Sequence, residues 1–180
     1  MEKYSDSDIT LRPLEISDAD AAVKWYMDEK VSEFCSWEAF PSPESAADYF
    51  VRHDLTHPWN RAICASGRVV GSIAVKPFRG SDRCRAELGY GVASEYWGRG
   101  IATRAVRLAA NAAFVEWGHL ERLEAVVDVE NAASQRVMEK AGFVREGVLR
   151  KYYLLKGKPR DAVIFSLLST DATVNYFIDA

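Results

Sequence analysis

The sequence predicts a mixed α/β (α+β) fold built around a mostly antiparallel sheet with flanking helices. The middle of the chain alternates short β-rich runs with turn residues, as a meander does, and later β-rich runs alternate with helical patterns. With 180 residues and 48% hydrophobic content, the chain suits one globular domain with one sizeable core. We therefore expect a single domain over residues 1–180.

The first half of the chain carries recognisable start and turn signals. Ser17 with Asp20 resembles a capping box that opens a helix through Trp25, and Ser42-Pro43-Glu44 is typical of the start of a second helix to about His53. The predicted strands of this half are residues 8–13, 59–65 and 69–75, the last two joined by a Ser66-Gly67 turn.

The second half alternates strands and helices. A strand carrying Glu87 begins near Asp82 and runs to Val92. The elements predicted after it are a helix over 101–117, a β-rich run over 123–129, a helix over about 132–140 that stops at Gly142, and a last strand over 161–168.

A glycine-containing turn lies between the Glu87 strand and the next helix. Gly98 and Gly100 let a ligand approach the backbone, and the first N–H groups of the helix have no intrahelical partner. Arg99 and Arg104 add positive charge, so the segment suits a phosphate or diphosphate. The alternative is a tight turn whose glycines only solve a backbone problem.

A second polar helix start follows about thirty residues later. Asn131 is a favoured N-cap, which is one sufficient reason for its presence. Asn131, Ser134 and Met138 also share one helix face, and two polar groups followed by a thioether make a poor core face. We therefore expect this face to line a groove for an extended ligand that bears amides and ends in sulfur.

These segments resemble the GNAT superfamily of acetyl-CoA-dependent N-acetyltransferases, and within it the Rim-like branch of ribosomal-protein N-terminal and spermidine acetyltransferases. The resemblance covers about residues 8–168, which would form the core of the domain, and it implies a sheet of about seven strands. The marks that carry it are Ile9-Thr-Leu-Arg-Pro13, Ala86-Glu-Leu-Gly-Tyr90, Tyr96-Trp-Gly-Arg-Gly-Ile-Ala-Thr103, Asn131 to Phe143, and Lys156-Gly-Lys-Pro-Arg-Asp161.

The resemblance also implies a site for acetyl-CoA as cosubstrate. The amides of Arg99 to Thr103 would bind the pyrophosphate, the end of the Glu87 strand would lie beside the pantetheine, and Asn131 would hydrogen-bond it. The implied cofactor-binding residues are Tyr90, Gly91, Val92, Trp97, Gly98, Arg99, Gly100, Ile101, Ala102, Thr103, Asn131 and Ser134.

Two residues are the predicted catalytic groups. An amine acceptor arrives largely as an ammonium and must lose a proton before it attacks a thioester. Glu87 is our candidate base, on the same side of its strand as Gly89 and Gly91; the alternative is a Glu paired with Arg83 or Arg85. Many relatives carry a Tyr general acid where this chain has Met138, which has no proton to donate, so the resemblance assigns that role to Ser134.

The acceptor is the least readable part of the prediction. Trp37, Glu38 and Phe40 either shape substrate choice or close the edge of the core. Tyr152 and Tyr153 are fallback proton donors or substrate-wall residues, and the alternative is packing. We expect acetyl transfer to a primary amine of a protein N-terminus, a polyamine or another small molecule by direct attack in a ternary complex. The rival function is a non-catalytic domain that binds or senses acyl-CoA.

Other functions fit the sequence less well. A dinucleotide-binding turn would need Gly or Ala where Thr103 stands, and a cysteine nucleophile would need partners that Cys84 lacks. His53 and His57 have metal-like spacing but no third ligand, so no metal is expected. The net charge of -3 without a basic stripe disfavours nucleic acid, and neither a membrane span nor a signal peptide is expected. We expect a cytoplasmic protein and leave a nuclear location open, and its oligomeric state also stays open.

Overall fold

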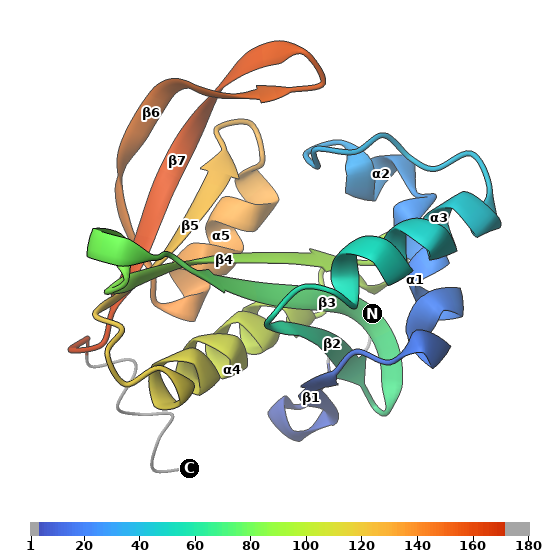
Figure 1. The fold of residues 1–180 in the computed structure, drawn as a ribbon, viewed down its shortest axis with the longest axis horizontal. Helices are drawn as coiled ribbons and strands as arrows, with labels where there is room; N and C mark the ends of the chain where they lie inside the picture. The colour runs from blue at the N-terminus through green and yellow to red at the C-terminus, as the bar shows by residue number, and fades with distance from the viewer. Residues whose placement is uncertain (1–3, 172–180) are drawn as a thin grey trace. The chain divides into compact units, whose positions relative to one another are not determined.

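Seven strands form one mixed sheet in the order β1-β2-β3-β4-β5-β7-β6 (Figure 1). The computed structural model describes residues 4–171. The strands are β1 (Ile9–Pro13), β2 (Asn60–Ala65), β3 (Arg68–Pro77), β4 (Arg85–Val92), β5 (Arg122–Asp128), β6 (Val144–Leu155) and β7 (Lys158–Leu168). Of the neighbouring pairs whose register is described, only β4 and β5 run parallel. The predicted mixed fold with a mostly antiparallel sheet is confirmed.

Four helices lie where the sequence predicted them, with ends within about one residue of the predicted ones except at the end of the helix that begins at Pro43, and a fifth is additional. They are α1 (Ala19–Tyr26), α2 (Glu29–Ser32), α3 (Pro43–Tyr49), α4 (Ile101–Glu116) and α5 (Ala132–Ala141). A π-helical turn, Phe50–Asp54, continues α3 to the end that the sequence predicted for it. The short α2 lies in the aromatic and acidic segment and was not predicted.

The described chain forms two compact units, one of residues 4–74 and 90–105 and the other of residues 75–89 and 106–171. Strands β3 and β4 and helix α4 each contribute residues to both units. The prediction of one domain over residues 1–180 stays a prediction, and residues 1–3 and 172–180 lie outside the described part.

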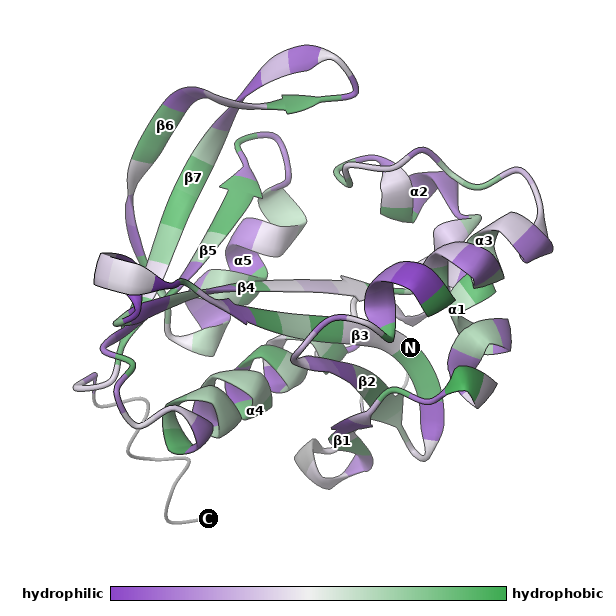
Figure 2. Ribbon diagram, in the orientation of Figure 1, coloured by the Kyte–Doolittle hydropathy of each residue, from purple (hydrophilic) through white to green (hydrophobic). Residues whose placement is uncertain are grey.

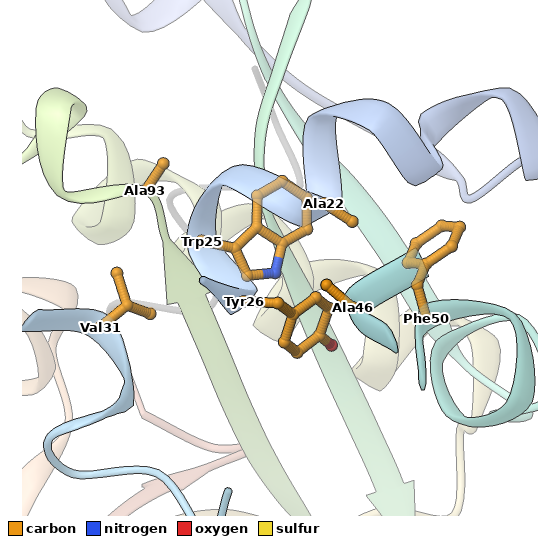
Figure 3. Close-up of a cluster of buried hydrophobic side chains, with 7 residues drawn as sticks. All are labelled: Ala22, Trp25, Tyr26, Val31, Ala46, Phe50 and Ala93. Atoms are coloured by element: carbon orange, nitrogen blue, oxygen red, sulfur yellow. The ribbon is translucent and has the colours of Figure 1, made fainter. Parts of the chain in front are cut away.

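The first unit combines the β1–β2–β3 meander with α1, α2 and α3. Ser66 and Gly67 both adopt positive φ, 46° and 78°, in the predicted turn between β2 and β3. Both central residues of a type I′ hairpin turn need this conformation. Helices α1 to α3 share a buried cluster made of Ala22, Trp25, Tyr26, Val31, Ala46, Phe50 and Ala93 (Figure 3).

The start of α1 differs from the prediction. Asp18, and not Ser17, stands at the N-cap of α1 and makes no side-chain cap hydrogen bond to the helix; its carboxylate instead accepts the backbone N–H of Glu15, in the turn before α1, at 2.9 Å. The reason is a contact that the local pattern does not reveal, because both carboxylate oxygens of Asp18 also bind Arg12 of β1, at 2.8 and 2.7 Å. The predicted N-cap of α3 is confirmed, since Ser42 Oγ accepts from Ser45 N.

The second unit is built on β5, which is paired with β4 on one side and β7 on the other. Strands β5 and β7 are largely apolar, whereas the edge strand β6 mixes polar and apolar residues (Figure 2). The predicted last strand begins three residues earlier, at Lys158, and pairs with the long β6 as a hairpin. Helix α5 contacts β5 and β6, and the hairpin extends past the end of β5 (Figure 1).

Candidate active site

Glu87 is an exposed carboxylate on β4. Its neighbours Ala86 and Leu88 are buried, so the alternation along β4 turns Glu87 and Gly89 to the accessible face. Arg85, the suggested ion-pair partner, instead binds Glu124 at 2.7 Å and lies 3.6 Å from Asp82. Within residues 4–171, the Glu87 side chain makes no hydrogen bond or ion pair, so the carboxylate is available as a proton acceptor.

The accessible face of β4 is open beside this carboxylate. A Cβ atom added to Gly89 or Gly91 would meet no described atom within 4 Å. Alternation places both glycines on the side of Glu87. The sequence prediction that these glycines leave room for a ligand agrees with this geometry, while the role of Glu87 as a base stays a prediction.

Gly71 of β3 supports the end of β4 and was missed by the sequence reasoning. A Cβ atom at Gly71 would lie 2.1 Å from the carbonyl oxygen of Gly91 and 2.9 Å from the Cα of Val92. The backbone of β4 therefore approaches β3 more closely than any side chain at this position would permit. A glycine inside a predicted strand was the only sequence signal for this contact.

The turn after β4 has the conformation that its glycines suggested. Gly98 and Gly100 adopt φ of 74° and 86°, a region that costs other residues free energy. Trp97 fixes the start of the turn by donating from Nε1 to the Val92 carbonyl at 2.7 Å, although the side chain stays 45% exposed. Both glycines are therefore required by the backbone, which does not exclude a ligand role.

The backbone amides at the start of α4 suit an anion. The first hydrogen bond from the helix back to the turn runs from Arg104 N to Gly100 O, so the N–H groups of Ile101 to Thr103 precede it. Arg99 lies in the same turn, donates Nη2 to the Glu95 carbonyl at 3.0 Å, and has a buried Nε without a hydrogen-bond partner among residues 4–171. The free N–H groups, the positive end of the α4 dipole and the Arg99 guanidinium together fit a diphosphate.

Helix α5 begins and ends at the predicted residues. Asn131 Oδ1 accepts a hydrogen bond from Ser134 N at 3.0 Å, and the left-handed Gly142, at φ 97°, closes the helix. Asn131 and Ser134 are half-buried. The prediction that Met138 lines a groove with them is wrong, because Met138 is 1% exposed and belongs to the core. Met138 lies one turn further along the same face of α5, where that face is covered by the core.

The aromatic segment packs on the core of the first unit. The ring centroids of Trp37 and Phe40 lie 5.3 and 5.8 Å from that of Tyr26, and Phe40 also contacts Tyr49 at 5.0 Å. Both rings therefore close the edge of the core, whereas Glu38 is exposed. A role of these three residues in substrate choice stays a prediction.

The two adjacent tyrosines of β6 have different environments. Tyr152 is 55% exposed, while Tyr153 donates its hydroxyl proton to Asp128 at 2.8 Å. Burial and this hydrogen bond raise the pKa of Tyr153 to about 12, so its hydroxyl stays protonated near neutral pH.

His53 and His57, the two histidines with metal-like spacing, make contacts with aromatic and backbone groups. His53 stacks on Tyr49 with ring centroids 4.2 Å apart, and His57 Nδ1 accepts from Trp59 N at 3.2 Å. Within residues 4–171, no cluster of three or more histidine, cysteine, aspartate or glutamate side chains is arranged to hold a metal ion. No helix in the described part of the chain combines the length and the apolar character of a membrane span.

Comparison with known proteins identifies the family. Residues 8–144 match the GNAT acetyltransferase domain family. The uncharacterized N-acetyltransferase p20 of Bacillus licheniformis is 29% identical over 95% of this chain and 98% of its own length. Spermidine N(1)-acetyltransferase of Escherichia coli K12 is 28% identical over 86% of this chain and 83% of its own.

A solved structure supports the same assignment. The RimJ protein of Mycobacterium smegmatis, in complex with CoA-disulfide, superposes with a TM-score of 0.75 at 25% identity over 95% of this chain and 88% of that one. The relatives thus include the two kinds of enzyme that define the Rim-like branch. The chain belongs to the GNAT family of acetyltransferases and is an N-acetyltransferase.

Proposed function

We propose that this N-acetyltransferase transfers the acetyl group of acetyl-CoA directly to a primary amine within a ternary complex. The observation that carries the proposal is the exposed Glu87 carboxylate, which has no partner among residues 4–171 and stands on a glycine-flanked strand face. Direct transfer needs a proton acceptor for the amine and no covalent acyl-enzyme.

Glu87 would act at the start of the reaction. It accepts a proton from the ammonium form of the acceptor, directly or through one water, and the neutral amine nitrogen then attacks the thioester carbonyl carbon. The new C–N bond forms as the C–S bond breaks, and the leaving sulfur carries the electron pair. The second proton that the nitrogen loses ends on this sulfur, so that an amide and the CoA thiol are released. A carboxylate without an ion-pair partner is suited to the first step because no cation competes for its oxygens.

Ser134 would act at the end of the reaction. Its hydroxyl would hydrogen-bond or protonate the departing CoA thiolate, a role for which Met138 has no donor. Asn131 would bind the pantetheine arm through its side-chain N–H groups, since its oxygen is engaged with Ser134 N. These two assignments rest on the polar start of α5.

The turn after β4 would bind the diphosphate of acetyl-CoA. We assign the diphosphate to the turn from Trp97 to Gly100 and the amides of Ile101 to Thr103, supported by the positive φ of both turn glycines and the partnerless Nε of Arg99. The end of β4, from Tyr90 to Val92, would lie beside the pantetheine.

The acceptor would be the amine of a protein N-terminus, a polyamine or another small molecule. Among the relatives named above, one is a spermidine N(1)-acetyltransferase and one is a RimJ protein. Spermidine presents a primary amine, as does a protein N-terminus. Trp37, Glu38, Phe40 and Tyr152 remain our candidates for acceptor contacts.

An acceptor panel with labelled acetyl-CoA tests this proposal. Peptides with different N-termini, polyamines and amino acids would be assayed with the purified full chain, and the acceptor with the highest kcat/KM would be used for initial-rate kinetics. Intersecting double-reciprocal lines are expected for a ternary complex. Parallel lines would contradict direct transfer, and acetyl-CoA binding without transfer to any acceptor would support the binding or sensing function instead.

A further inference from the structure

Asp128 is a buried carboxylate at the end of β5, directly before the start of α5. Its side chain is 1% exposed. Arg160 binds it through two nitrogens, Nε to Oδ2 at 2.9 Å and Nη2 to Oδ1 at 2.8 Å. Tyr153 donates its hydroxyl to Oδ2, and the backbone N–H of Glu130 donates to Oδ1, each at 2.8 Å. Each oxygen thus receives two hydrogen bonds, so the desolvated charge is fully compensated.

The ionisation of Asp128 follows from these contacts. Burial alone would raise the pKa of Asp128, but the hydrogen bonds of Arg160, Glu130 N and Tyr153 outweigh burial and lower it. The carboxylate therefore stays charged at the pH of any ordinary assay, and its removal would deprive Arg160, Tyr153 and the Glu130 N–H of their shared acceptor.

The backbone of Asp128 continues the network into α5. Its carbonyl oxygen accepts from Asn131 N at 3.0 Å and from Gln135 Nε2 at 3.2 Å. Asn131 in turn accepts from Ser134 N. An unbroken series of hydrogen bonds therefore leads from Arg160 and Tyr153, through Asp128, to the two residues to which we assigned acetyl-CoA contacts.

The far end of this series is the β6–β7 hairpin. Tyr153 and Arg160 face each other across the hairpin, at the edge of an irregularity that spans Leu149 to Tyr153 on β6. Arg160 also pairs with Glu130 in the turn that leads to α5. In Figure 1 the hairpin passes alongside the end of β5, where this turn begins. The hairpin is thus tied to the start of α5 by side chains from both of its strands.

We infer that Asp128 is a positioning residue for acetyl transfer, which holds Asn131 and Ser134 in place by joining Arg160 and Tyr153 to the start of α5. This inference rests on the proposed function of Asn131 and Ser134. Asp128 itself touches neither substrate, so its contribution passes through the geometry of the α5 start.

The first unit offers a matched control for a purely structural role. Asp18 is also buried, also binds an arginine through two hydrogen bonds and also accepts one backbone N–H, from Glu15. Its side-chain hydrogen bonds within residues 4–171 go to Arg12 and Glu15, and neither of these partners belongs to α5. Asp18→Asn should therefore lower the stability of the fold for the same reason as Asp128→Asn, the loss of a buried charge bound to an arginine, without moving Asn131 or Ser134.

The experiment compares Asp128→Asn with Asp18→Asn in the full chain. We expect both variants to have a lower Tm, but only Asp128→Asn to weaken acetyl-CoA binding by calorimetry and to lower kcat/KM, each by roughly tenfold. Hydrogen exchange of the Ser134 amide should also accelerate in Asp128→Asn alone. If Asp128→Asn does not fold, Tyr153→Phe, which keeps the Asp128–Arg160 pair, should show the same changes at smaller size.

A double-mutant cycle separates positioning from general damage. In an Asn131→Asp background the pantetheine contact is already lost, so adding Asp128→Asn should cost less than about threefold more in acetyl-CoA affinity. Two results would overturn the inference if the wild type is active. One is that the two substitutions lower acetyl-CoA affinity by fully additive amounts. The other is that Asp128→Asn keeps the acetyl-CoA affinity and the Ser134 amide exchange rate of the wild type. If the wild type transfers no acetyl group and Asn131→Asp leaves acetyl-CoA affinity unchanged, the proposed function fails instead.

Discussion

Asn131 Oδ1 accepts the backbone N–H of Ser134 at 3.0 Å, which is the N-cap of α5. An asparagine side chain has one acceptor oxygen and a donor NH₂ group, so a cap made by the oxygen leaves the NH₂ group as the donor. The sequence offered two alternatives for Asn131, a structural cap and a cofactor ligand. The geometry makes them compatible, because the cap orients the amide that would bind the pantetheine.

Asn131→Asp should separate these two roles. Aspartate is as good an N-cap as asparagine, and its charge is favourable near a helix N-terminus, so we expect an unchanged or higher Tm. It has no N–H to donate, so acetyl-CoA affinity should fall roughly tenfold by calorimetry. Asn131→Ala removes both functions and should lower the Tm as well. Unchanged acetyl-CoA affinity in both variants would limit Asn131 to capping.

Ser134→Ala should affect turnover more than binding. The cap uses the backbone N–H of Ser134, which alanine keeps, so α5 should retain its start. If the hydroxyl serves the departing thiolate, kcat should fall roughly ten to a thousandfold with little change in acetyl-CoA affinity. An equal loss of affinity and kcat would instead assign the hydroxyl to cofactor binding.

Signals confined to a few neighbouring residues predicted local structure well. Ser42, the Ser66-Gly67 turn and Gly142 each fix their own backbone through contacts within a few positions, and all three have the predicted role. The fold class followed because strand and helix periodicities are local as well. The N-cap role of Asn131 was predicted in the same way, from its place directly before a helical pattern.

The missed features depend on contacts between distant parts of the chain. Gly71 lies too close to the backbone of Gly91 for a side chain, and Asp128 binds Arg160, which is 32 residues further on. No local pattern reveals such a partner. Asp18 displaced the predicted cap at Ser17 because Arg12 of β1 binds it. Met138 was assigned to a groove from its helix face, but packing against the core decided its burial.

Acid should destabilise the fold in part through Glu146. Hydrogen bonds from Arg122, and then from Ser166, lower the pKa of this carboxyl from 4.5 to about 2. The pKa is lower in the folded state, so the contribution is complete above about pH 4.5 and is lost as the pH falls towards 2. The side chain is 40% exposed, so solvent screening keeps the contribution near or below about 1 kcal/mol.

Thermal unfolding of Glu146→Gln between pH 6 and pH 2.5 measures this effect. We expect the variant to lie roughly 2–4 °C below the wild type at pH 6, with the gap closing as the pH falls. Glu139→Gln, at an exposed acid of α5 without a charged partner among residues 4–171, should show no such convergence. A gap that is constant over this range would rule out the linkage.

Gly71→Ala should damage the end of β4. The new Cβ atom would stand 2.1 Å from Gly91 O, so one strand must shift, at a cost of about 1–3 kcal/mol or more. We expect the Tm to fall by roughly 2–12 °C and acetyl-CoA affinity to fall with it, since Tyr90 to Val92 are proposed contacts. Gly118→Ala, where the added atom meets nothing within 4 Å, should keep the wild-type Tm within a degree or two. A wild-type Tm in Gly71→Ala would contradict the close approach of the strands.

Glu87→Gln tests the proposed base. The substitution keeps the size of the side chain, and Glu87 has no ion pair within residues 4–171 to lose, so the Tm should not change. With the best acceptor, kcat/KM should fall about a hundredfold at neutral pH because no carboxylate takes the proton of the ammonium. The loss should shrink as the pH rises, since a growing fraction of the amine is already neutral. Glu139→Gln should keep the wild-type profile throughout. Full activity of Glu87→Gln at every pH would move the search for the base to ordered water or to the exposed acids Glu33 and Glu38 of the first unit.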